Sequence, residues 1–182
     1  MKVRRGAPAD VPRALAIWRD AVDATHGFLT AKDREDIDRM VAEEFLPAAE
    51  LWLVDDPTGR AAGFLVMDGE EIDALFVDPA LHGQGYGTAL VRHALTLSPQ
   101  AKVEASEQAD NALPFYESRG FVRIGRSETD PQGRPYPLVR LAFAGLPGSD
   151  GKRGAGEDQS QAAPRDDQRT DDISHRGRRE PR

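Results

Sequence analysis

The amino-acid sequence of 182 residues contains no cysteine. The chain can therefore form neither a disulfide framework nor a thiolate metal site, and a covalent acyl-cysteine intermediate is excluded. Long apolar runs are also missing, because no stretch approaches the ~20 residues that a membrane-spanning helix needs. The first ten residues, MKVRRGAPAD, carry charges without the apolar core of a secretory signal. We therefore expect a cytoplasmic protein with no membrane partner.

Positive charge is in the minority. The chain has 24 Lys and Arg against 31 Asp and Glu, which gives a net charge of −7 at pH 7. From Gly145 onward each sign occurs eight times, so the preceding residues hold 16 basic and 23 acidic side chains and carry the whole net charge. A domain that binds nucleic acid needs the opposite sign, so we expect no nucleic-acid partner.

The last part of the chain has few large apolar residues. From Gly145 to Arg182 it consists mainly of Gly, Asp, Arg, Gln and Ser, a composition that cannot bury enough surface to fold. The preceding part is long enough for one domain with a proper core. The sequence thus predicts a folded domain over residues 1–144 and a disordered polar tail over residues 145–182.

Periodicity and turn residues predict the order of strands and helices in the domain. Strands are predicted at 3–5, 51–54, 62–67, 71–77, 102–106, 121–126 and 136–143, and helices after Asp10, after Thr30, after the loop 82–87 and over 111–119. Asp10 and Thr30 are expected to cap the first two helices, with Asp33 answering Thr30 in a short capping box and Pro47 ending the second helix. This order indicates a mixed α/β sheet.

The most informative segment is EIDALFVDPALHGQGYGTALVRHAL, from Glu71 to Leu95. It predicts a strand that stops before Pro79, a loop with alternating glycines and the start of a helix. Glycines allow backbone N–H groups to approach a ligand closely, and the first N–H groups of the helix point at the same place. This arrangement is typical of phosphate binding.

Several phosphate-binding loops share this geometry. A Walker A loop needs a lysine, but Gly87 is followed by Thr88, which excludes it. A dinucleotide fingerprint needs G-x-G-x-x-G, one residue more than the spacing of Gly83, Gly85 and Gly87. Glu104 lies where a ribose-binding acid would be expected, so this alternative stays open. A plain tight turn is a third alternative, although it requires fewer glycines.

A second segment, ALPFYESRGF at residues 112–121, follows the next predicted strand. Together the two segments resemble the GNAT superfamily of acetyl-CoA-dependent N-acetyltransferases, whose motifs are Gln/Arg-x-x-Gly-x-Gly/Ala and N-x-x-A-x-x-F-Y-x-x-x-G-F. Two positions depart from these motifs. His82 stands where the family has Arg or Gln, and Ala109 stands where it has Asn, the nearest amide being Asn111. The resemblance covers residues 1 to about 144.

The resemblance implies a mixed central sheet with splayed strands, flanked by two N-terminal and two later helices. It also implies acetyl-CoA as the co-substrate and no metal. Cofactor contacts are implied at Leu75, Phe76, Val77, His82, Gly83, Gln84, Gly85, Tyr86, Gly87, Thr88, Asn111 and Tyr116. The resemblance also implies that Tyr116 protonates the leaving thiolate, and aromatic packing is its alternative role. Helix capping is the alternative role of Asn111.

The general base has three candidates. Glu71 and Asp73 lie two residues apart on one predicted strand and so share a face, where a carboxylate could deprotonate the amine directly or through water. His26 lies in the linker between the first two helices and has a suitable pKa. The alternatives are strand-edge charges and a solvated histidine. Tyr136 either lines the substrate wall that the resemblance places at this linker or packs within its own turn.

The sequence therefore predicts an enzyme that transfers an acetyl group from acetyl-CoA to a primary amine by direct attack in a ternary complex. A non-catalytic acyl-CoA-binding or sensor module with the same fold is the alternative. A Rossmann-type nucleotide binder is not favoured by the strand–helix–helix order at the start. The acceptor amine and the oligomeric state are not predicted, although the acidic domain favours a cationic acceptor.

Overall fold

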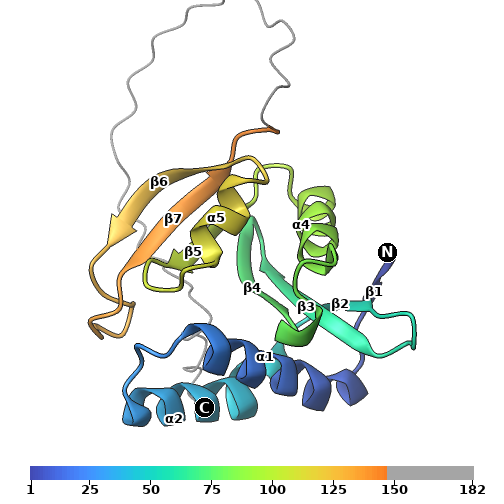
Figure 1. The fold of residues 1–182 in the computed structure, drawn as a ribbon, viewed down its shortest axis with the longest axis horizontal. Coiled ribbons are helices and arrows are strands. Elements are labelled where there is room, and N and C mark those ends of the chain that lie inside the picture. Colours follow the sequence, from blue (N-terminus) through green and yellow to red (C-terminus); the bar gives the residue numbers. More distant parts are fainter. Residues whose placement is uncertain (147–182) are drawn as a thin grey trace, which may run out of the picture.

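Seven strands form one sheet in the computed structural model, which describes residues 1–146 (Figure 1). The strands are β1 (Val3–Arg5), β2 (Leu51–Asp55), β3 (Ala61–Asp68), β4 (Glu71–Val77), β5 (Lys102–Ser106), β6 (Phe121–Ser127) and β7 (Leu138–Phe143). The helices are α1 (Val11–Thr25), α2 (Ala31–Met40), α3 (Leu46–Ala48), α4 (Tyr86–Leu97) and α5 (Ala112–Glu117). The predicted tail over residues 145–182 lies outside the described residues, except for Gly145 and Leu146.

The sheet is mixed, with the strand order β1-β2-β3-β4-β5-β7-β6. Among the described strands, β4 and β5 form the single parallel pair, and every other neighbouring pair is antiparallel. A Rossmann sheet is built from parallel strands, so this topology rules out the nucleotide-binding alternative that the glycine spacing left open. The glycine-rich loop follows β4, the strand at which the antiparallel and parallel pairings meet.

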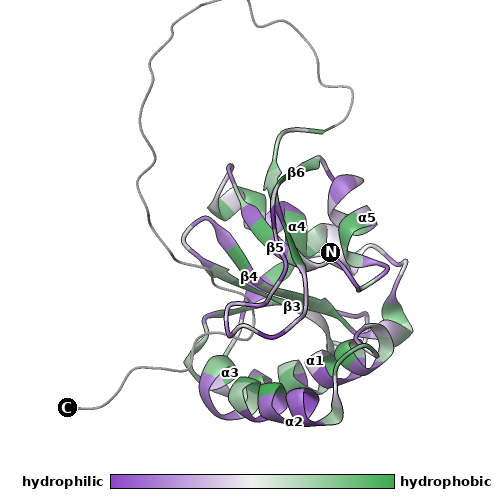
Figure 2. Ribbon diagram, turned by 90° about the vertical axis from the view of Figure 1, so that its left-hand side faces the viewer, coloured by the Kyte–Doolittle hydropathy of each residue, from purple (hydrophilic) through white to green (hydrophobic). Residues whose placement is uncertain are grey.

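Two helical layers enclose the sheet, with α1 and α2 on one face and α4 and α5 on the other (Figure 1). Each helix presents one apolar stripe to the sheet because its apolar residues recur every three or four positions. The stripe of α1 consists of Ala14, Ile17, Trp18, Ala21 and Val22, and that of α4 includes Leu90, Val91 and Ala94. Figure 2 shows hydrophobic residues along β3 and β4, between the two layers. The predicted α/β fold class is confirmed.

The strands β4 and β5 part shortly after they begin to pair. Their ladder consists of Glu71 opposite Lys102 and Ile72 opposite Val103. On the other side of β4, Val66 pairs with Ala74 but Met67 pairs with Ile72, so Asp73 is the extra residue of a β-bulge. A bulge bends its strand and increases the local twist, which turns β4 away from β5. The predicted splayed strands are therefore present, and they open toward the glycine-rich loop.

Some predicted helix ends differ from those observed. Asp10 makes no side-chain cap on α1; its carboxylate instead accepts a hydrogen bond from the Ala7 N–H and pairs with Arg4. The second helix does not stop at Pro47 but continues through a π-helical turn, Val41–Phe45, into α3. The wider turn ends two residues before Pro47, whose ring would otherwise clash with an earlier carbonyl oxygen.

Candidate active site

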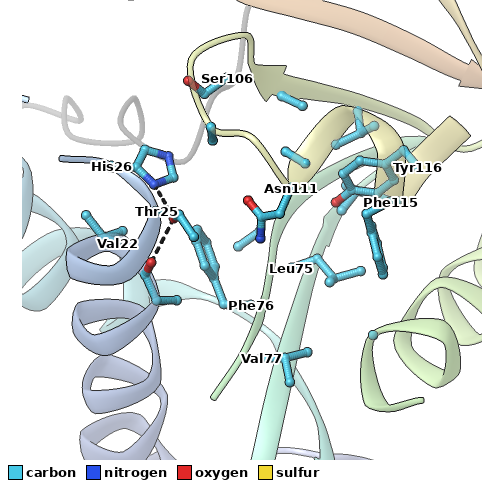
Figure 3. Close-up of a pocket in the computed structure, with 18 of the residues that line it drawn as sticks. Val22, Thr25, His26, Leu75, Phe76, Val77, Ser106, Asn111, Phe115 and Tyr116 are labelled. Carbon is cyan, nitrogen blue, oxygen red and sulfur yellow. Dashed lines mark hydrogen bonds between the residues drawn. The ribbon is translucent and has the colours of Figure 1, made fainter. Parts of the chain in front are cut away.

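A cavity of about 490 Å³ opens where β4 and β5 diverge. This volume lies within the usual range of small-molecule sites. The cavity is bounded by α1, the α1–α2 loop, β4, the glycine-rich loop, β5 and α5 (Figure 3). It brings together most of the predicted site residues: His26, Asp73, Leu75, Phe76, Val77, His82, Gly83, Gly85, Tyr86, Gly87, Thr88, Asn111 and Tyr116. Glu71 and Gln84 are not among the residues that line it.

The glycine-rich loop has the backbone shape that a phosphate cradle requires. Gly83 and Gly85 have φ angles of +77° and +91°, in a region that residues with side chains rarely adopt. Gly85 occupies the N-cap of α4 and offers no side chain, so the first N–H groups of the helix are left for a ligand. His82 does not reach outward to replace the motif arginine, because its Nε2 lies 3.1 Å from the carbonyl oxygen of Val77. The cradle thus fits a phosphate through its backbone.

Gly87 is required for a different reason. A Cβ atom at Gly87 would lie 2.8 Å and 2.9 Å from two ring carbons of Phe115. The obstacle to a side chain at this position is therefore the neighbouring aromatic ring. The glycine lets α5 pack closely against the first turn of α4, which brings Tyr116 next to the cradle.

Tyr116 is buried with an exposure of 6%. Its ring makes edge-on contacts with Phe115 and Phe121, at centroid distances of 5.0 Å and 5.4 Å. Burial raises the pKa of Tyr116 well above its usual value, and the nearby Arg119 only partly opposes this. Within residues 1–146 the hydroxyl makes no hydrogen bond, and Figure 3 shows it on the side of the ring that faces Asn111. The phenol therefore remains a proton donor across the physiological pH range.

The amide of Asn111 also faces the cavity. Asn111 stands at the N-cap of α5, but its side chain makes no capping hydrogen bond, so the alternative role of helix capping is wrong. Figure 3 shows the amide in the middle of the site, between Tyr116 and the α1 side. Beyond Ile72, β4 pairs with β3 alone, so the edge of β4 that includes Leu75 borders the cavity. A strand edge can hydrogen-bond an extended ligand through its backbone.

The two acidic candidates on β4, Asp73 and Glu71, differ in whether they line the cavity. Asp73, with an exposure of 2%, lines the cavity from the bulge. Glu71 does not line it, because its Oε1 accepts a hydrogen bond of 2.6 Å from Nη2 of Arg140 on β7. The alternation of side chains along a strand predicted that Glu71 and Asp73 would face the same space. The ion pair of Glu71 with Arg140 and the bulge at Asp73 place the two carboxyl groups differently. Glu71 is therefore not retained as a base.

Sequence reasoning missed a second carboxyl at the same place. Glu104 on β5 lines the cavity, and we considered it only as a ribose-binding acid. Because Ile72 pairs with Val103, the next residues along the two strands, Asp73 and Glu104, are neighbours where the strands begin to part. The proximity of Asp73 and Glu104 follows from the register between β4 and β5, which no local pattern in the sequence reveals.

His26 lines the cavity from the end of α1. Burial, aided by the charge of Arg34, lowers the pKa of His26 to about 4, so the ring is neutral at pH 7. The Thr25 hydroxyl donates to the carbonyl oxygen of Ala21 and lies 2.7 Å from Nδ1 of His26 (Figure 3). Since the hydroxyl proton is already used, Nδ1 carries the proton and Nε2 is left as an acceptor.

Next to His26, the aromatic side chains of Phe28 and Tyr136 form one wall of the cavity. The rings of His26 and Phe28 lie 5.2 Å apart, and those of Phe28 and Tyr136 lie 5.8 Å apart. The Tyr136 hydroxyl accepts from the Thr30 N–H and donates to the Asp33 carboxylate. Thr30 does cap α2 as predicted, since its hydroxyl accepts from the Asp33 N–H, but the reciprocal half of the capping box passes through Tyr136. The loop before β7 is thereby fixed to the start of α2.

Two further features of the described residues concern membranes and metals. None of the helices in residues 1–146 is long and apolar enough to cross a bilayer. In the same part of the chain, no group of three or more His, Asp or Glu side chains is arranged to hold a metal ion.

Comparisons with known proteins agree with this geometry. Residues 23–135 match the family model described as acetyltransferase (GNAT) domain. The peptidyl-lysine N-acetyltransferase YjaB of Salmonella typhimurium is 43% identical over 143 residues, which cover 79% of this chain and 98% of the relative. The solution structure of apo YjaB from Escherichia coli has a TM-score of 0.75 at 40% identity, covering 80% of this chain and 98% of that chain.

A more distant solved structure shares the fold. It is PaiA N-acetyltransferase from Thermoplasma acidophilum in complex with coenzyme A, with a TM-score of 0.61 at 15% identity, and the match covers 77% of this chain and 98% of that chain. The family match spans more than half of the sequence, and the relative from Salmonella is covered almost completely. The chain therefore belongs to the GNAT family and is an N-acetyltransferase.

Proposed function

We propose that this N-acetyltransferase transfers the acetyl group of acetyl-CoA to the side-chain amine of lysine in a protein. The observation that carries the proposal is a single cavity with a phosphate cradle at one end, a protonated tyrosine in the middle and carboxyl groups beside an aromatic wall at the other end. Relatives that the chain matches over nearly their whole length are named peptidyl-lysine N-acetyltransferases. The non-catalytic sensor alternative has no comparable support.

Residues at different positions along the cavity bind the cofactor, orient it and donate a proton. The backbone of Gly83 to Thr88 holds the cofactor phosphates, and the free edge of β4 with Asn111 orients the arm that follows them. Bound acetyl-CoA supplies an acetyl thioester activated for attack by an amine. Tyr116 gives its phenolic proton to the departing sulfur, since burial keeps that proton in place until it is needed.

Asp73 is the base that we propose for the acceptor amine. It lies in the bulge at the point where β4 and β5 part, and Glu104 stands next to it. A lysine ammonium entering this end meets negative charge, and loss of its proton produces the neutral amine that attacks. His26 is held neutral with a pKa of about 4 and offers Nε2 as a hydrogen-bond acceptor, so it orients the amine.

The proposal is tested with peptides that differ only in which amine is blocked. A peptide with an acetylated N-terminus and one lysine should release CoA from acetyl-CoA and gain one acetyl group on the lysine, as read by tandem mass spectrometry. The same peptide with a free N-terminus and a dimethylated lysine is the control and should react far more slowly. If the control reacts and the lysine peptide does not, the acceptor assignment is wrong.

A further inference from the structure

Arg119 lies just beyond α5 and contacts the cofactor end of the cavity, although no motif points to it. Its Nε and Nη2 donate to Oγ1 of Thr88 at 3.1 Å and 2.8 Å, and its Nη1 donates to the Phe115 carbonyl oxygen at 2.7 Å and to Oγ of Ser118 at 2.9 Å. The guanidinium also lies 3.7 Å from the centroid of the Phe115 ring. The side chain is thus held in one position by α4 and α5 together.

No carboxylate balances this charge. Within residues 1–146, Arg60, Arg92 and Arg119 are the arginines without an ion pair, and Arg60 and Arg92 are exposed whereas Arg119 is partly buried. A desolvated cation without an anion nearby is costly. Among the described residues that line the cavity, Arg119 is also the sole lysine or arginine. The environment of Arg119 therefore has room for an anion that the protein itself does not provide.

The hydrogen bonds of Arg119 point to where this anion lies. Thr88 belongs to the first turn of α4, whose free N–H groups face the same end of the cavity. Four of the five N–H groups of the guanidinium are used, so one on Nη2 and the full charge remain for a ligand. Because Thr88 accepts two hydrogen bonds from Arg119, its own hydroxyl proton is also directed elsewhere.

We infer that Arg119 binds the diphosphate of the acyl-CoA cofactor and supplies the guanidinium that is missing at the motif position, where His82 stands. The inference rests on the proposed use of acetyl-CoA. His82 is engaged with the carbonyl oxygen of Val77, and the loop itself contains neither lysine nor arginine. Arg119 brings a cation from the other side of the site, with the Thr88 hydroxyl as an additional donor.

The test measures the affinity of Arg119→Gln for three ligands of decreasing size: CoA, dephospho-CoA and pantetheine. Calorimetry serves for the first two and ligand-induced thermal shift for the third. We expect Arg119→Gln to bind CoA and dephospho-CoA at least about tenfold more weakly than the wild type, with a smaller salt dependence, and to bind pantetheine equally. Arg119→Lys, which keeps the charge and loses the paired geometry, should fall between the two.

Arg92→Gln is the matched control, because it removes the same charge from an exposed position on α4 outside the cavity. A folded Arg119→Gln protein that binds CoA as tightly as Arg92→Gln would overturn the inference. So would a loss seen with CoA but absent with dephospho-CoA, since it would assign Arg119 to the 3′-phosphate. If the wild type itself does not bind CoA, the proposed function fails as well, which separates the two results.

Discussion

At the level of single residues, burial has opposite effects on the pKa values of Tyr116, which is buried, and His26, which is partly buried. Burial raises the pKa of Tyr116, which keeps an acid protonated, and lowers the pKa of His26, which keeps a base neutral. Both groups therefore enter the reaction uncharged. The carboxyl groups of Asp73 and Glu104 line the same cavity from the two strands that diverge.

Replacing Tyr116 with Phe should lower kcat by at least about tenfold, because a general acid contributes roughly 10²–10⁴ in rate. The ring contacts with Phe115 and Phe121 persist in the variant, so the CoA affinity and the melting temperature should change little. Steady-state kinetics, calorimetry and thermal melting check these three quantities. Since burial raises the pKa of the phenol, wild-type kcat should also show no loss from Tyr116 ionisation up to pH 10. A variant with wild-type kcat would reduce Tyr116 to a packing residue.

His26 should make the fold sensitive to mild acid. Its folded-state pKa of about 4 lies below the unfolded value of 6.5, so between these values the unfolded chain binds more protons. The free energy of unfolding should therefore fall as the pH drops from 6.5 to 4, by about 1–3 kcal/mol from this group. Urea unfolding of the wild type and His26→Gln at pH 7 and pH 4.5 measures the difference. Equal pH dependence in the two proteins would mean that His26 is not held neutral by the fold.

At the scale of elements, the glycine-rich loop and the bulge in β4 create the site. The loop requires positive φ angles just before α4, and the bulge turns β4 away from β5 so that a cavity forms between them. Neither strand lies at the edge of the sheet. The opening is thus enclosed by pairing on both sides, which holds the cradle and the acceptor wall at a fixed separation.

Gly85→Val should weaken acetyl-CoA binding severely while the fold persists, because a β-branched residue is strained at a φ angle of +91° and the loop must move. Gly59→Val is the matched control, since Gly59 has a φ angle of +85° with open space around it in the β2–β3 turn. Both variants should lose similar stability in thermal melting, and only Gly85→Val should lose affinity in calorimetry. Unchanged affinity in a folded Gly85→Val protein would show that the glycine-rich loop does not bind the cofactor.

Local sequence patterns predict the helices and strands well, but they predict poorly which residues of different elements contact each other. The ranges of β1, β4 and β5 are confirmed residue for residue, because apolar alternation and turn residues delimit them. The bulge at Asp73 depends on how β3 pairs with β4, which no single strand reveals. Likewise, the link between Tyr136 and Asp33 joins residues from opposite ends of the domain. The candidate site was predicted where motifs carry it and missed at Glu104 and Arg119.

At the scale of the whole molecule, the domain encloses its site within residues 1–146. The last described residues still contribute, because the Ala144 N–H donates to the Gly120 carbonyl oxygen and Gly145 contacts Gly120. A shortened protein should therefore keep Gly145 and is best cut after Leu146, the last described residue.

Removing residues 147–182 should leave the melting temperature and the affinity for acetyl-CoA unchanged. This expectation follows from the sequence, since the segment has few large apolar side chains and equal numbers of positive and negative charges. Thermal melting and calorimetry of the shortened and full-length proteins compare the two quantities directly. A clear drop in either would show that this segment contributes to the domain or to the site.

The central claim is that acetyl-CoA and the amine occupy one cavity together and react directly. Initial rates at varied concentrations of acetyl-CoA and of a lysine peptide test it in a single data set. Attack in a ternary complex predicts double-reciprocal lines that intersect, as the absence of cysteine also leads one to expect. Parallel lines, which indicate a covalent acyl-enzyme and successive occupation of the site, would contradict the account.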